Sequence, residues 1–171
     1  MKFQLAVVLS AAASVCAVPT TQSSIQTRAI AGLDETQSRH AQAIIDVVKT
    51  EGVGALGCQA AIATALTESE LYMHANHAVP GSLDKPHDRV GADQDSVGLF
   101  QQRAVFYTDV GCTMDAACSA GLFVKDLRAV AGWQGMETAA LCQAIQRSQI
   151  PDAYIKNVAK AVEVCGGSGL A

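Results

Sequence analysis

The sequence predicts a mainly α-helical single domain with a long polar loop and little or no β-structure. Apolar residues recur at the three- and four-residue spacing of helices, whereas the alternating, β-branched pattern of strands is nearly absent. The polar segment 75–98 contains several prolines and glycines, and a loop of that length inside a compact domain is usually functional or disordered. The predicted helices span residues 34–51, 58–74, 116–129, 137–147 and 152–164.

The first and last helices have clear end signals. Asp34 or Thr36 can cap the first helix, because either side chain can accept a hydrogen bond from a backbone N–H of the first turn. The glycine-rich stretch 52–57 separates this helix from the second. Pro151 marks the start of the last helix, where its missing N–H costs nothing, and two glycines follow the end of that helix.

The N-terminal segment has the layout of a secretory signal peptide. Lys2 is followed by an apolar run, and Val15 and Ala17 occupy the small-residue positions of a cleavage site. The apolar run is shorter than the roughly 20 residues of a membrane-spanning helix. We therefore expect a signal peptide at 1–17, a flexible leader or pro-segment at 18–30 and one folded, secreted domain at 31–171.

Five cysteines remain after removal of the predicted signal peptide, and disulfides are their default state in a secreted chain. Cys112 and Cys118 can close a short loop, and a bridge from Cys58 to Cys165 would join the second helix to the end of the chain. Cys142 would then be a buried free thiol. No CxxC pair occurs, so we expect no metal site formed by the cysteines.

The charge balance is acidic and restricts the expected partners. The formal net charge is −4, and loss of Lys2 with the signal peptide makes it more negative. Basic residues are not clustered, so nucleic acid is not an expected partner. No later segment is long and apolar enough to cross a membrane. We expect a monomer that requires no cofactor and no metal.

Two glutamates, Glu68 and Glu70, lie in the second predicted helix. At about 100° per residue, Glu68 falls beside the face where Ala61 and Ala65 allow another element to pack closely, and Glu70 lies roughly 160° away. A carboxyl group beside apolar surface has a raised pKa and can stay protonated, as a general acid must. Periodicity alone leaves open that both glutamates are solvated, and it favours Glu68 for chemistry.

Three sequence motifs together resemble a known superfamily. The chain has "ALTES" at 65–69, "PHDRVGADQDSVGLFQQR" at 86–103 and "QRSQIPDAY" at 146–154. This order and spacing resemble the goose-type lysozyme and lytic transglycosylase superfamily, in the variant of actinobacterial and mycobacteriophage lysins and secreted fungal muramidases. The resemblance spans roughly residues 40–160 and implies a single lysozyme-like helical domain with a long active-site loop.

The resemblance also implies roles for individual residues, with bacterial peptidoglycan as the substrate. Glu68 matches the catalytic acid of the superfamily. Gln146 falls near the asparagine of its "AYN" motif, and Tyr154 is a candidate for a residue that touches the acid. The residues expected to line the sugar-binding cleft are Ser69, Ser96, Gly98, Gln101, Gln102, Gln146 and Tyr154.

The implied reaction is hydrolysis of the β-1,4 bond between N-acetylmuramic acid and N-acetylglucosamine. Glu68 would protonate the leaving oxygen, and a second carboxylate about 6.5–9.5 Å away would activate water. Asp95 and Asp93 are the candidates, with Asp95 ranked first because it directly precedes Ser96. Without such a carboxylate, the sugar's own hydroxyl would close a 1,6-anhydro ring, as in a lytic transglycosylase. A secreted cell-wall-binding effector without turnover is a third possibility.

Two metal-binding alternatives stay open. Three loop aspartates could hold Ca²⁺, although their spacing lacks the 12-residue pattern of a calcium loop. Three histidines could hold another metal ion. The residues concerned are Asp88, Asp93, Asp95, His74, His77 and His87. Arg103 and Arg147 are expected to make structural hydrogen bonds to loop carboxylates.

Overall fold

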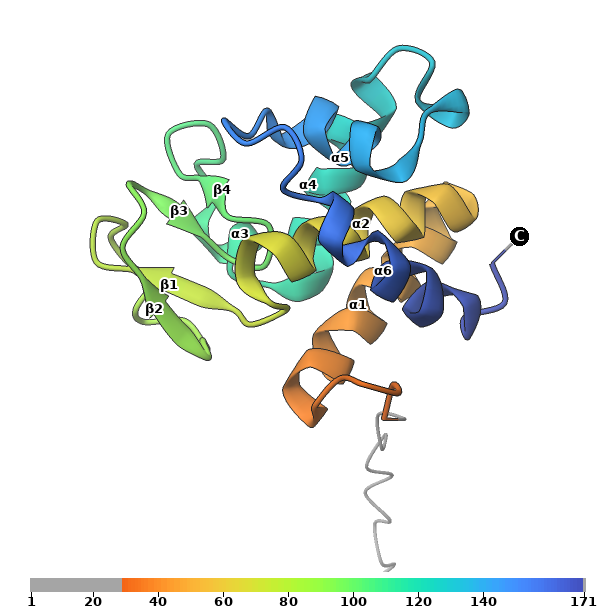
Figure 1. Cartoon of the computed structure of the whole chain (residues 1–171). Coiled ribbons are helices and arrows are strands. Elements are labelled where there is room, and N and C mark those ends of the chain that lie inside the picture. Colours follow the sequence, from red (N-terminus) through yellow and green to blue (C-terminus); the bar gives the residue numbers. More distant parts are fainter. Residues whose placement is uncertain (1–28, 171) are drawn as a thin grey trace, which may run out of the picture.

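The computed structural model describes residues 29–170, which form a mainly helical domain. The helices are α1 (Glu35–Glu51), α2 (Gly54–Ser69), α3 (Val110–Thr113), α4 (Ala116–Ala129), α5 (Thr138–Gln146) and α6 (Ile155–Gly166), with a 3-10 turn at Trp133–Gly135. The strands are β1 (His74–Asn76), β2 (Arg89–Gly91), β3 (Ser96–Val97) and β4 (Gln102–Arg103). The strands lie together at one side of the helical body (Figure 1).

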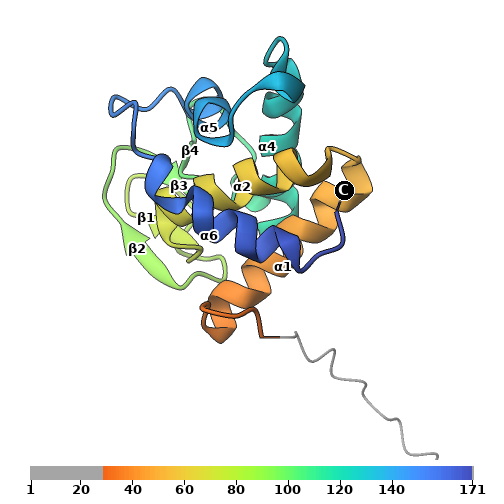
Figure 2. The same ribbon diagram turned by 45° about the vertical axis from the view of Figure 1, so that its right-hand side comes forward.

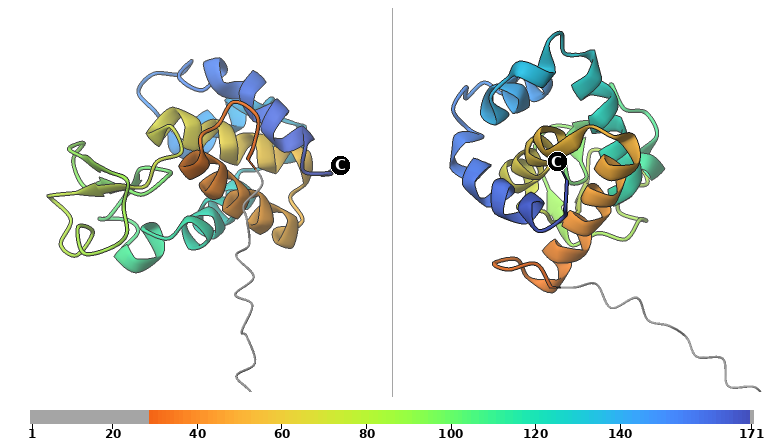
Figure 3. Two further views of the ribbon diagram at one scale, coloured as in Figure 1. Left: turned by 90° about the horizontal axis from the view of Figure 1, so that it is seen from below. Right: turned by 90° about the vertical axis from the view of Figure 1, so that its right-hand side faces the viewer.

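Helix α2 is the centre of the domain. It packs against α1, α4, α5 and α6, and the views in Figures 2 and 3 show these helices arranged around it. Its sequence explains this position, because α2 is apolar on nearly all sides and rich in alanine, so that neighbouring helices can approach it closely. A helix buried in this way gives a rigid base for the residues at its end.

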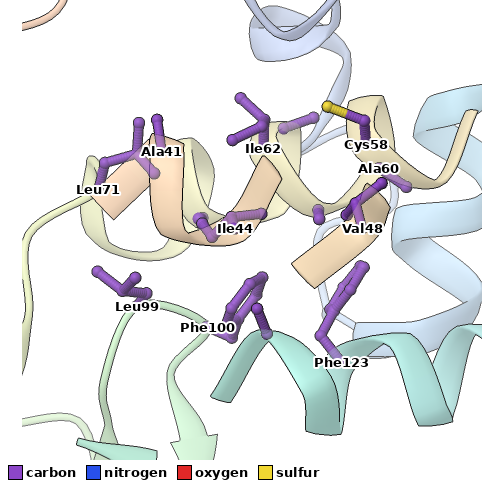
Figure 4. Packing of buried hydrophobic residues seen from close by; sticks show 14 of the residues in the cluster. Ala41, Ile44, Val48, Cys58, Ala60, Ile62, Leu71, Leu99, Phe100 and Phe123 are labelled. Carbon is purple, nitrogen blue, oxygen red and sulfur yellow. The ribbon is translucent and has the colours of Figure 1, made fainter. Parts of the chain in front are cut away.

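The hydrophobic core continues from the helices beneath the strand region. Phe100, in the segment between β3 and β4, stacks on Phe123 of α4 with ring centroids 4.9 Å apart. Leu99 and Phe100 belong to the same packed cluster as Ile44 and Val48 of α1, and in Figure 4 Phe100 lies beneath Ile44. The polar loop is therefore anchored in the same core that surrounds α2.

The sequence predictions for α1 and α4 are confirmed. Asp34 caps α1: its Oδ1 accepts a hydrogen bond from the Gln37 N–H at 2.8 Å, and Gln37 Oε1 accepts one from the Asp34 N–H at 3.0 Å. This reciprocal pair is a capping box, which satisfies two N–H groups at the start of the helix. Helix α4 has the predicted bounds and begins after Asp115, whose side chain accepts from the Cys118 N–H.

The predicted bounds of the second helix were wrong at both ends. Helix α2 begins at Gly54 and ends at Ser69, because the backbones of Glu70 and Leu71 turn into the left-handed region with φ of 54° and 61°. The buried Leu71 side chain and the hydrogen bond from the Leu71 N–H to the Ala65 carbonyl hold this turn. Non-glycine residues adopt this conformation only where the surroundings stabilise it, so the turn has no local sequence signal.

The last two helices are slightly shorter at their starts than predicted. Helix α5 begins at Thr138. Helix α6 begins at Ile155, because turns occupy residues 151–154. Tyr154 is therefore the residue before α6 rather than part of its first turn. The position matters because a residue at the start of a helix can direct its side chain back over the neighbouring α2.

Both predicted disulfides are present, from Cys58 to Cys165 and from Cys112 to Cys118. The first joins α2 to the end of α6, and the second lies between α3 and α4. Cys142 is free and buried, as predicted.

The long polar loop folds into two small sheets. Strand β1 pairs in parallel with β2, and β3 pairs antiparallel with β4. Between residues 29 and 170, no helix is long and apolar enough to cross a membrane. The predicted signal peptide at 1–17 and nearly all of the predicted leader at 18–30 lie outside the described residues.

Candidate active site

Glu68 lies one residue before the end of α2, half-buried at the junction of the helices and the strand region. Burial raises the pKa of its carboxyl, and the negative charge of Asp93 raises it further. The hydrogen bond from Tyr154 and the charge of Lys156 oppose this shift. Burial is the largest effect, so Glu68 keeps its proton to a higher pH than an ordinary glutamate.

Tyr154 holds the Glu68 carboxyl in place. Its hydroxyl donates a hydrogen bond to Glu68 Oε1 at 2.6 Å, which confirms the predicted contact with the acid. The Tyr154 side chain is fully buried, and burial raises the pKa of its phenol so that the hydroxyl stays protonated. This burial corrects the prediction that Tyr154 also contacts substrate, because it can reach substrate only through Glu68.

Asn157 makes a second contact between α6 and the end of α2. Its Nδ2 donates to Thr67 Oγ1 at 2.9 Å, and Thr67 Oγ1 donates to the Ala63 carbonyl at 2.8 Å. Asn157 was not among the predicted site residues. It lies three residues after Tyr154, in the first turn of α6, so the two side chains lie on the same side of the helix. Together the two side chains fix α6 against the residues that flank Glu68.

Asp93 is the loop carboxylate whose charge acts on Glu68. It lies exposed between β2 and β3, and within residues 29–170 its carboxylate has no hydrogen bond or ion pair to another residue. An exposed carboxylate of this kind is available to water and to a ligand. Its negative charge raises the pKa of Glu68, so the two carboxyl groups are coupled electrostatically.

Asn76 supports the turn that carries Asp93. Its buried Nδ2 donates to three backbone carbonyls, those of Asp93 at 3.2 Å, Gln94 at 3.1 Å and Ser96 at 3.1 Å. Its Oδ1 accepts from the Ala78 N–H at 2.9 Å, so the amide is bonded on both sides. Sequence analysis did not identify Asn76, because its three partners are 17 to 20 residues away along the chain.

Asp95, which sequence analysis ranked first as the base, has structural partners instead. Its Oδ1 accepts a hydrogen bond from Arg103 Nε, and its Oδ2 accepts one from the Val105 N–H at 2.7 Å. The hydrogen bond from Arg103 is the largest of the effects that lower the pKa of Asp95. Both carboxylate oxygens thus hold the β3–β4 hairpin together, and the structure favours Asp93 over Asp95 beside Glu68.

Three residues of the predicted sugar cleft are buried and act on the backbone, which corrects the prediction that they contact substrate. Ser69 Oγ donates to the Ala65 carbonyl at 3.0 Å and is also 2.7 Å from the Leu99 carbonyl. Ser96 is buried in β3. Gly98 has φ 78° and lies so close to the Thr113 carbonyl that a Cβ would collide with it. The Ser69 contact thus joins the end of α2 to the loop, and the close approach of Gly98 joins the loop to α3.

The three predicted glutamines differ in exposure. Gln101 Nε2 donates to the Gly98 carbonyl at 3.0 Å, and Gln146 Nε2 donates to the Phe100 carbonyl at 3.1 Å; both side chains are half-buried. Gln102 is buried, and its Nε2 donates to the Ser119 carbonyl at 3.3 Å. All three line one hollow of about 390 Å³ beside the strands. These three glutamines of the predicted sugar cleft therefore border an open space.

The predicted metal-binding alternatives find no support in the geometry. Across the described part of the chain, no three or more His, Cys, Asp or Glu side chains are grouped so that they could hold a metal ion. Asp88, for example, accepts a hydrogen bond from the Met73 N–H at 2.8 Å and lies 3.7 Å from His40 Nδ1.

No family model matches the sequence. No curated protein matches it either.

Proposed function

We propose that this chain is a secreted peptidoglycan hydrolase that cleaves the β-1,4 bond between N-acetylmuramic acid and N-acetylglucosamine. The observation that carries the proposal is the Glu68 carboxyl: it is half-buried, is held by Tyr154 at 2.6 Å, and has a pKa raised by burial and by the charge of a second carboxylate, Asp93. Two carboxyl groups with different environments are the arrangement that glycoside hydrolysis requires.

In the proposed reaction, Glu68 donates its proton to the glycosidic oxygen while the bond from that oxygen to C1 of the N-acetylmuramic acid breaks. Asp93 accepts a proton from a water molecule, whose oxygen forms the new bond to C1 from the opposite face. The configuration at C1 is inverted, and Glu68 is left ionised. The Tyr154 hydroxyl then stabilises the Glu68 carboxylate, because it donates to the oxygen that carries the new charge.

The choice of Asp93 rather than Asp95 rests on their partners. Both oxygens of Asp95 accept hydrogen bonds from the β3–β4 hairpin, so using Asp95 as a base would break the contacts that hold the loop. Asp93 has no such contacts within the described residues, and its backbone is positioned by Asn76. A fixed backbone with an unoccupied carboxylate suits a group that must orient a water molecule.

The location of the protein is part of the proposal. The two disulfides suit an oxidising environment, and the sequence of residues 1–17 has the pattern of a secretory signal. An extracellular enzyme would meet bacterial peptidoglycan directly. The motifs at 65–69, 86–103 and 146–154 support the same substrate, because they resemble those of the goose-type lysozyme and lytic transglycosylase superfamily.

The proposal is tested with purified chain lacking residues 1–17 on Gram-positive cell walls, measured as loss of turbidity and release of soluble glycan. Glu68→Gln removes the acid and keeps the shape, so it is expected to lower the rate by at least about a hundredfold. Glu70→Gln is the matched control. Glu70 is exposed and pairs with Arg89 at 2.8 Å, so its loss is expected to leave the rate within about twofold.

Other outcomes would replace the proposal. Equal clearing by wild type and Glu68→Gln would remove Glu68 from the mechanism. Binding of cell walls without release of glycan would indicate a non-catalytic effector. Products that end in 1,6-anhydro-N-acetylmuramic acid would indicate a lytic transglycosylase, in which the sugar's own hydroxyl takes the place of water.

A further inference from the structure

The hollow of about 390 Å³ beside the strands is lined by residues other than Glu68 and Asp93. It lies between β4 with its following loop, the C-terminal part of α4 and the end of α5. Its walls carry amide, guanidinium, carboxylate and aromatic groups. The residues used below are Gln102, Phe106, Tyr107, Asp126, Gln146 and Arg147.

Arg147 is the distinctive charge of this hollow. It follows α5 with a left-handed backbone, φ 55°, which is fixed by the hydrogen bond from its N–H to the Gln143 carbonyl at 2.8 Å. Within residues 29–170 its guanidinium has no carboxylate at ion-pair distance, contrary to the prediction that it would bind a loop carboxylate as Arg103 does. An Arg side chain with free donors can bind a carboxylate through two parallel hydrogen bonds.

The Arg147 charge acts on the interior of the hollow. It opposes the rise in the pKa of Tyr107 that burial and Asp126 cause. Asp126 is the carboxylate that lines the same hollow, and its Oδ2 accepts a hydrogen bond from the Tyr107 hydroxyl at 2.6 Å. Asp126 is thus bonded to tyrosine, and the guanidinium of Arg147 is left for a ligand.

Gln102 is a second polar residue in the wall of the hollow whose side chain is not fully hydrogen-bonded. Its side chain is only 5% exposed, and its Oε1 is buried without a hydrogen-bond partner among the described residues. A buried acceptor without a partner costs stability unless another group supplies a donor. Phe106, at the border of the hollow, is 78% exposed and offers an apolar face to the same ligand.

The hollow adjoins the candidate active site. Ser69, the residue after Glu68, donates a hydrogen bond to the Leu99 carbonyl at 2.7 Å, and Gln101, two residues after Leu99, lines the hollow. Gln146, at the end of α5, also lines the hollow, and its Nε2 donates to the Phe100 carbonyl of the same loop at 3.1 Å. The wall of the hollow is therefore connected through residues 99–101 to the end of α2 that carries Glu68.

We propose that this hollow is a substrate subsite in which Arg147 binds a carboxylate carried on the lactyl arm of N-acetylmuramic acid. The carboxylate is either that of the lactyl group itself, in strands without peptides, or one in the peptide attached to it. This inference rests on the proposed function. The subsite would also let the protein distinguish peptidoglycan from β-1,4-linked chains of N-acetylglucosamine alone, because those chains have no lactyl arm and no carboxylate.

The test measures binding in the Glu68→Gln background, where the ligand is not consumed. Calorimetry would give the Kd for three soluble glycan ligands: peptide-bearing strands, strands stripped of peptides by an amidase, and strands whose carboxylates are capped with methylamine by carbodiimide coupling. Arg147→Gln is added to remove the charge, and Arg39→Gln removes the same charge at another hollow. Turnover by the wild type is measured separately and reports on the proposed function.

Arg147→Gln is expected to raise the Kd for carboxylate-bearing strands three- to tenfold, to leave the Kd for capped strands unchanged and to lose its effect at high salt. An effect on stripped strands assigns the lactyl carboxylate, and an effect on peptide-bearing strands alone assigns the peptide. An unchanged Kd for both charged ligands, or an equal loss with capped strands, overturns the subsite. Failure of the wild type to cleave any strand overturns the proposed function and leaves the binding result to decide the subsite.

Discussion

Removing the disulfide between Cys58 and Cys165 is expected to destabilise the protein far more than removing the one between Cys112 and Cys118. The first joins residues 107 apart and the second residues 6 apart. In the chain-entropy model, these loops correspond to about 4.8 and about 2.2 kcal/mol at 25 °C. The long bridge also connects α2, which carries Glu68, to the end of α6, so it acts on the two helices that form the site.

The perturbations are the paired substitutions Cys58→Ala with Cys165→Ala, and Cys112→Ala with Cys118→Ala. The assay is urea unfolding at 25 °C followed by circular dichroism, with a common m-value checked across the variants. The difference of about 2.6 kcal/mol between the two pairs follows from loop length alone. Equal destabilisation, or a larger loss for the short loop, would refute the reasoning that chain entropy governs these bridges.

Three further results are expected. Tyr154→Phe removes a hydrogen bond that favours ionised Glu68, so the pKa of Glu68 rises and the decline of activity at high pH moves to higher pH. Gly98→Ala forces a side chain at φ 78° against the Thr113 carbonyl and is expected to cost more than about 1 kcal/mol in urea unfolding. Burial raises the pKa of Cys142 to about 11, so at pH 8 its thiol is expected to react with iodoacetamide at least about a hundredfold more slowly than free cysteine.

Each of these expectations has a control. Tyr72→Phe removes a hydroxyl that bonds to Asp34, away from Glu68, and should leave the pH profile in place. Gly121→Ala lies in α4 where a Cβ meets nothing within 4 Å, and a destabilisation equal to that of Gly98→Ala would contradict the role assigned to the close approach. Rapid labelling of Cys142 in the native state, at the rate seen in urea, would show that its surroundings open readily.

The pH dependence has a definite sign. In the proposed reaction Glu68 acts as an acid only while protonated, so activity is expected to be lost as pH rises through the pKa of Glu68 in the free enzyme. Because that pKa is raised, activity persists to higher pH than an ordinary glutamate would allow. The same group disfavours folding when it is ionised, since burial penalises the charged form, so this contribution lowers stability as pH rises above the pKa of an exposed glutamate.

Local signals in the sequence were sufficient for much of the fold. The apolar spacing and the polar residue at the start defined α1 and α4, because a helix depends on contacts within four residues. The cysteine spacing and the odd count led to both disulfides and to a free Cys142. Glu68 could be singled out by its motif, and Tyr154 by the place of its motif near the chain end.

The parts that could not be predicted depend on long-range contacts. The end of α2 is set by left-handed residues Glu70 and Leu71, which the burial of Leu71 stabilises from elsewhere in the fold. The preference for Asp93 over Asp95 depends on Arg103, eight residues from Asp95, pairing with that aspartate. Two aspartates only two residues apart have similar sequence contexts, and their hydrogen-bond partners in the fold distinguish them.

The central claim is that Glu68 and Asp93 together direct water to the glycosidic bond. It is tested most directly by digesting peptidoglycan in water enriched in ¹⁸O and measuring the soluble products by mass spectrometry. The account predicts reducing-end N-acetylmuramic acid with one ¹⁸O atom at C1 from the wild type, and loss of this product in both Glu68→Gln and Asp93→Asn. Unlabelled 1,6-anhydro products, or full labelling by Asp93→Asn at the wild-type rate, would contradict it.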